Sequence, residues 1–224
     1  MREPRDNADA EALDLEQARL ILGGAPEVRD RLATDPRVLM GVWGVAWLVG
    51  YLALWFTSRP TSTASAAASE FAAPAVWAFI VFYGLLVLAV VVTIIHVTRR
   101  GRGLKGASAT SGTMYGLIWP IAFTVVGMIL GALGASELLD PRAMALVANA
   151  LPCVVVGTLY MAGGAMERDW AWFILGAWIA VIAGIGTMVG VPHTYLVMAR
   201  AGGGGMLLGG LGYHLARRRE RGTT

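Results

Sequence analysis

The sequence predicts an all-helical, polytopic membrane protein, and two observations carry this prediction. Of its 224 residues, 56% are hydrophobic and only 15% are charged, whereas about a quarter of the residues in soluble domains are charged. The charged residues fall in short blocks separated by apolar stretches of about 20 residues, the length that crosses roughly 30 Å of hydrocarbon as a helix. We therefore expect a bundle of six transmembrane helices, preceded by an N-terminal cytoplasmic amphipathic helical segment.

The starts of these spans carry helix signals. Asp-Pro pairs at 35–36 and 140–141 each place a capping side chain before a proline at the first helical position. Pro74 and Pro192 are interpreted as equally early helix residues. The six predicted spans are residues 36–57, 74–97, 113–134, 141–165, 170–190 and 192–216.

The chain is expected to have three parts. Residues 1–35 form the cytoplasmic amphipathic segment, in which Leu15, Ala18 and Leu22 lie along one helical stripe. Residues 36–217 form the six-helix transmembrane domain, and residues 218–224 form a short basic cytoplasmic tail. A narrow apolar stripe among alternating charges is typical of a helix at a membrane surface or on a protein partner.

The distribution of basic residues predicts the orientation. Of the 18 Lys and Arg residues, 15 fall on one side of the six-span topology, and only Arg59 and Arg142 fall on the other. Because Lys and Arg are retained on the cytoplasmic side, both termini are expected in the cytoplasm of a multi-pass plasma-membrane protein. The remaining basic residue, Arg200, lies inside the sixth span.

Small residues spaced four apart predict close helix packing. They let two helices approach each other closely in a membrane, which accounts for many of the 29 glycines. We interpret them as contacts within the bundle, and a homodimer interface is the alternative. The glycines of these patterns are Gly127, Gly131, Gly176, Gly184, Gly205 and Gly209.

Four residues are candidates for a cavity or a substrate contact. Arg200 lies about eight residues inside the external end of the sixth span, beside the glycine run 202–205. It is expected to point into the bundle toward Asn149, or to snorkel outward beside a packing patch. Trp47 and Tyr51, near the middle of the first span, either pack on small faces or line a cavity. The functional interpretation is an anionic or amphipathic substrate at Arg200, and an aromatic or amphipathic ligand at Trp47 and Tyr51.

Catalytic chemistry is not indicated anywhere in the sequence. The spans contain no Asp or Glu, the single cysteine, Cys153, cannot form an intrachain disulfide, and no phosphate-binding P-loop occurs. We therefore expect no catalytic residue, cofactor or metal, and no nucleic-acid partner. The lipid bilayer is the expected surrounding, and any ATP hydrolysis is expected on a separate chain.

The layout resembles the permease subunits of ABC exporters of the ABC-2 type, without a shared residue motif. The common features are the amphipathic segment, the six spans and the short tail. The departures are the stretch 98–112, which we expect to be a glycine-rich loop, and the almost direct connection between the fifth and sixth spans. The resemblance implies a non-catalytic subunit of a transport system, working with a separate ATPase. The alternative is a membrane accessory or regulatory protein that binds a soluble cytoplasmic partner through residues 1–35.

Overall fold

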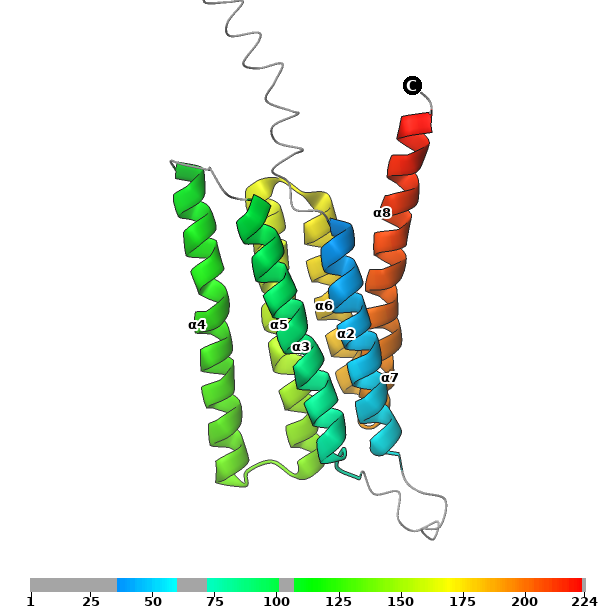
Figure 1. Cartoon of the computed structure of the whole chain (residues 1–224). Helices are drawn as coiled ribbons and strands as arrows, with labels where there is room; N and C mark the ends of the chain where they lie inside the picture. Colours follow the sequence, from blue (N-terminus) through cyan, green and yellow to red (C-terminus); the bar gives the residue numbers. More distant parts are fainter. Residues whose placement is uncertain (1–35, 60–71, 101–106, 223–224) are drawn as a thin grey trace, which may run out of the picture. The chain divides into compact units, whose positions relative to one another are not determined.

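The computed structural model describes residues 36–59, 72–100 and 107–222, and every regular element in these ranges is a helix (Figure 1). The amphipathic segment predicted for residues 1–35 and the last two residues of the predicted tail lie outside the described residues. In chain order, the helices are α2 (Pro36–Thr57), α3 (Val76–Arg100), α4 (Ala107–Ser136), α5 (Pro141–Glu167), α6 (Trp170–Val189), α7 (His193–Val197), the π-helix η1 (Met198–Gly204) and α8 (Gly205–Gly222).

Among the described residues, five helices are long and apolar enough to cross a membrane, namely α2 to α6. The chain therefore has the helices and the composition of a membrane-embedded protein. The sixth predicted span is also helical, but its residues are divided among α7, η1 and α8. The count of six spans stays a prediction, because no single α-helix of this last run has the required length and hydropathy.

The helix boundaries agree with the prediction at some places and differ at others. The starts of α2, α5 and α6 are as predicted, whereas α3 begins two residues after Pro74 and α7 begins one residue after Pro192. The polar stretch 98–112 was expected to be a loop, but most of it belongs to the ends of α3 and α4. An α-helix can extend beyond its hydrophobic residues, because the backbone hydrogen bonds of a helix do not depend on the polarity of the side chains. The first residues of α4 are mostly Ala, Ser and Thr.

The chain divides into two compact units. The first comprises Met1–Asp35 and Ile94–Gly103, of which the structure describes only the end of α3. The second comprises Pro36–Thr93 and Leu104–Thr224, and it holds the hydrophobic core and the candidate site.

Two aspartates cap the helices of the second unit. The Asp140 carboxylate accepts hydrogen bonds from the backbone N–H groups of Arg142 and Ala143, at 2.8 and 2.9 Å, as predicted for the start of α5. The Asp169 carboxylate does the same at the start of α6. Between the two helices, Arg168 adopts a left-handed backbone with φ 56°. Arg168 and Asp169 therefore turn the chain within two residues, and α5 and α6 pack together.

Glycines bring the backbones of α5 and α6 into contact. A Cβ atom added at Gly157 would lie 2.8 Å from the carbonyl oxygen of Gly176. Conversely, a Cβ added at Gly176 would lie 2.5 Å from the carbonyl oxygen of Gly157. The two helices therefore cross where neither has a side chain, which is the packing expected of small residues in membrane helices.

The glycine run at 202–205 brings η1 into contact with α2. A Cβ added at Gly203 would collide with the backbone nitrogen of Leu48 and lie 2.8 Å from the carbonyl oxygen of Gly44. Gly202 lies under the Trp47 indole, where an added Cβ would be 2.7 Å from the ring. Because the neighbouring atoms at Gly203 are backbone atoms, no rotamer change could make room for a larger residue.

The helices α3 and α4 are more exposed than the others. Among the described residues of α4, only Val126 is buried, and the Tyr115 hydroxyl donates a 2.7 Å hydrogen bond to the carbonyl oxygen of Leu159 in α5. Added Cβ atoms at Gly127 and Gly131 meet no described atom within 4 Å. The small-residue face of α4 is therefore open in the single chain, and the homodimer stays a prediction.

The remaining predicted packing glycines fall into two groups. Gly176 and Gly205 have close neighbours. A Cβ added at Gly205 would lie 3.0 Å from the Trp178 indole nitrogen. Gly209 is in ordinary contact with Met40, whereas Gly184 has nothing among the described atoms within 4 Å. A four-residue spacing thus marks one helix face, but it does not specify which faces meet.

Candidate functional site

A small group of polar side chains lies inside the second unit, between α2, α5 and α7. The Tyr51 hydroxyl lies 3.9 Å from the Cys153 sulfur, within hydrogen-bond range for sulfur. The Tyr51 ring stacks on the Tyr195 ring, with centroids 6.4 Å apart. All three side chains are at least 95% buried. We call Tyr51, Cys153 and Tyr195 the polar core cluster.

Two buried polar side chains flank the polar core cluster and have unsatisfied hydrogen-bonding atoms. Asn149 is one helical turn before Cys153 on the same face of α5, and it is 7% exposed. Thr194 precedes Tyr195 and is fully buried. Among the described residues, neither the Asn149 amide nor the Thr194 hydroxyl has a hydrogen-bond partner. An unpaired buried polar group costs about 1–3 kcal/mol, so each of these two needs an explanation.

Aromatic rings surround the same group on the α2 side. Trp47 meets Tyr51 edge-on at a centroid distance of 5.6 Å, and Phe82 of α3 meets Tyr51 at 4.8 Å. A Cβ added at Gly50 would lie 2.5 Å from the Phe82 ring, so a glycine on α2 admits this ring. Trp47 and Tyr51 are therefore buried core residues beside polar atoms. They do not line the described pocket, and their role in a cavity stays a prediction.

The π-helix η1 follows directly on α7. Its last turn is closed by the Gly205 N–H, which donates to the carbonyl oxygen of Arg200 five residues earlier. The carbonyl oxygen of Ala201 accepts a 2.9 Å hydrogen bond from the Trp178 indole N–H of α6. Short π-helical segments are rare and often occur at functional sites, because they re-aim side chains within a helix.

Arg200 lies on the outer surface of the second unit rather than toward Asn149. Its side chain is exposed, and among the described residues it forms no hydrogen bond or ion pair. It is not among the residues that line the described pocket. Of the four predicted site residues, Trp47, Tyr51 and Asn149 thus belong to the buried interior, whereas Arg200 is separate from them.

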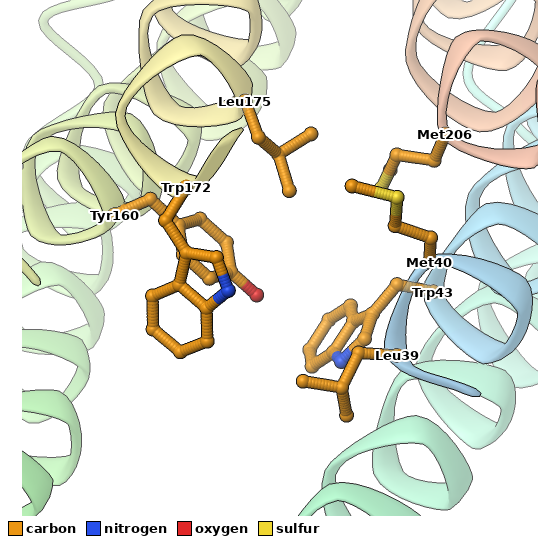
Figure 2. Close-up of a pocket in the computed structure, with 7 residues that line it drawn as sticks. All are labelled: Leu39, Met40, Trp43, Tyr160, Trp172, Leu175 and Met206. Carbon is orange, nitrogen blue, oxygen red and sulfur yellow. The ribbon is translucent and has the colours of Figure 1, made fainter. Parts of the chain in front are cut away.

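A pocket opens at the opposite end of α2 from the polar core cluster (Figure 2). Its volume is about 20 Å³, which is enough for roughly one water molecule, and no charged residue lines it. Figure 2 shows the side chains of α5 and α6 on one side and those of α2 and α8 on the other. Its walls suit an apolar group and offer nothing for a bare ion. The lining residues are Leu39, Met40, Trp43, Tyr160, Trp172, Leu175 and Met206.

Within the described residues, no group of three or more His, Cys, Asp or Glu side chains is arranged to hold a metal ion.

Sequence reasoning missed part of this site. It considered Cys153 as a residue that cannot form an intrachain disulfide, and it did not single out Thr194 or Tyr195, because hydroxyls inside apolar spans are common. The neighbourhood of Pro192 and the glycine run were the available signals that the last span is not a uniform α-helix.

Comparison of the chain with protein-family models, with curated proteins and with solved structures finds no match.

Proposed function

We propose that the chain is a non-catalytic, permease-like subunit of a transport system in the plasma membrane, with ATP hydrolysis on a separate chain. The supporting observation is a discontinuous helical run beside buried polar groups that have no partner. The run α7–η1–α8 changes its hydrogen-bond pattern at Met198–Gly204. Thr194 lies in α7, at the start of this run, and Asn149 lies on α5 one turn before Cys153 of the polar core cluster. Transport proteins often bind substrates where helices are discontinuous, because polar groups are available there inside the membrane.

The proposed substrate has both polar and apolar parts. The polar core cluster and its flanking Asn149 and Thr194 offer an amide and hydroxyls, whereas the pocket at the other end of α2 is apolar. Because the pocket has room for only about one water molecule, the apolar part of an amphipathic substrate would bind there after the surrounding helices move apart. In this proposal the chain itself is not an enzyme, because its contribution is binding and passage.

Purification from native membranes tests the proposal. A tagged chain isolated in mild detergent should bring an ATPase in stoichiometric amount, and ATP hydrolysis by the complex in liposomes should depend on the polar residues. Asn149→Leu and Thr194→Val should lower the hydrolysis rate. Thr124→Val, which removes a hydroxyl from the exposed side of α4, is the matched control and should not.

Two results would contradict transport. One is a stoichiometric soluble regulator that is lost when residues 1–33 are deleted, which would favour the accessory or regulatory role. The other is an ATPase whose rate is equal in the wild type, Asn149→Leu and Thr194→Val. The second result would remove the polar residues from the mechanism even if an ATPase is bound.

A further inference from the structure

Arg200 is held at the level of the middle of the neighbouring helices. The carbonyl oxygen of Ala201, the next residue, is bonded to Trp178, which lies near the middle of α6. Gly202 contacts Trp47, which lies near the middle of α2. Because α2 and α6 each have the length and hydropathy of a membrane span, these contacts place the Arg200 backbone deep within the hydrocarbon layer.

The direction of the Arg200 side chain follows from the π-helical bond. Since the Gly205 N–H donates to the Arg200 carbonyl, these two residues are stacked one π turn apart. Gly205 touches the indole of Trp178, which is 45% exposed on the outer side of α6. Arg200 therefore shares the outer surface with Trp178. Val181, one turn along the same side of α6, is 55% exposed. We call Arg200, Trp178 and Val181 the Arg200 face.

The charge of Arg200 has no acidic partner among the residues that the structure describes. An arginine near the middle of the bilayer is unfavourable against lipid and is normally paired. Among the five candidate membrane spans, the only Asp or Glu is Glu167, the last residue of α5, so a second copy of the chain would bring another Arg200 to the face and no carboxylate from the middle of a span. We therefore expect the counter-charge in a different molecule.

We propose that the Arg200 face binds a transmembrane helix of a different protein, and that this helix carries an Asp or Glu at the level of Arg200. The surrounding Trp178 and Val181 supply an apolar contact, and the ion pair sets the depth and the orientation of the partner helix. This inference goes beyond the proposed function, because either a transport complex or a regulatory complex would satisfy it.

Photo-crosslinking in the cells that make the protein tests the inference. A benzoylphenylalanine at Val181 should form an adduct with a membrane protein that has an Asp or Glu inside a transmembrane helix. Arg200→Gln should reduce the adduct roughly tenfold, whereas Arg200→Lys should largely keep it. A benzoylphenylalanine at Ile121, exposed on α4, is the control whose adducts should not change with Arg200→Gln.

A charge exchange completes the test. Arg200→Asp should abolish the adduct, and replacing the partner's carboxylate residue with Arg should restore it. The proposal is overturned by adducts with lipid alone, which would indicate a lipid-facing or snorkelling arginine. It is equally overturned by a protein adduct that is insensitive to Arg200→Gln, or by a partner without a carboxylate in its membrane helices. Size-exclusion profiles of each variant establish that the fold is intact.

Discussion

Gly203→Ala should destabilise the protein, because the added methyl group meets only backbone atoms. It would collide with the Leu48 backbone nitrogen, lie 2.7 Å from the Leu48 Cα and lie 2.8 Å from the Gly44 carbonyl oxygen. The two helices must therefore separate locally, and overpacking of this kind costs about 1–3 kcal/mol. For a chain of this length, 1 kcal/mol corresponds to about 2–4 °C, so we expect the midpoint of thermal unfolding to fall by about 2–12 °C.

Gly184→Ala is the matched control for this substitution. It adds the same methyl group to a helix interior, but no described atom lies within 4 Å of the added Cβ. Because Ala is favoured over Gly in a helix by about 0.5–1 kcal/mol, its midpoint should stay level or rise slightly. The measurement is circular dichroism at 222 nm, a helix-sensitive wavelength, during heating in one detergent at roughly one degree per minute. A Gly203→Ala midpoint equal to or above that of Gly184→Ala would refute the packing of η1 on α2.

Three further expectations concern hydrogen bonds, topology and the buried amide. Trp178→Phe removes the hydrogen bond from the indole N–H to the Ala201 carbonyl oxygen and should lower the free energy of unfolding by about 1 kcal/mol, which would appear as a lower midpoint of thermal unfolding. An unchanged midpoint would mean that this hydrogen bond does not stabilise the protein. Ser108 and Ser136 lie at the two ends of α4. With single cysteines at these positions in a Cys153→Ala background, an impermeant maleimide should label position 136 in intact cells and position 108 only after lysis; the reverse pattern would contradict the predicted orientation. Asn149→Leu should leave the unfolding midpoint level or raised, because it removes an unpaired buried amide, and a marked fall would indicate an internal hydrogen bond instead.

Much of the fold could be predicted from the sequence, because hydropathy is a strong signal for membrane helices. The Asp-Pro pair at 140–141 predicted both the start of α5 and its cap, and the cap is confirmed by two hydrogen bonds from backbone N–H groups. The ends of α3 and α4 could not be predicted equally well. The hydropathy of the polar stretch 98–112 does not distinguish a polar helix end from a loop.

The arrangement of the site was less predictable. Trp47, Tyr51 and Asn149 were singled out by residue type and depth, and the structure places all three in the interior. The side on which Arg200 lies depends on the π-helical bond pattern, which differs from an α-helix by a single residue in each turn. Sequence periodicity assumes 3.6 residues per turn, so it could not give the direction of a side chain within η1.

The π-helix η1 holds one residue more than an α-helix with the same number of turns. Each of its bonds closes over one residue more than an α-helical bond, so η1 has the character of a one-residue insertion held among glycines. Because the wider turn takes up the extra residue, Arg200 and Gly205 lie on the same side, as two residues four apart do in an α-helix. Deleting one of the glycines at 202–205 would therefore allow an unbroken α-helix in which Arg200 keeps its direction relative to α8. We expect such a deletion mutant to remain helical and to keep the Val181 adduct. Loss of the adduct would show that the π-helical turn itself is needed to direct Arg200.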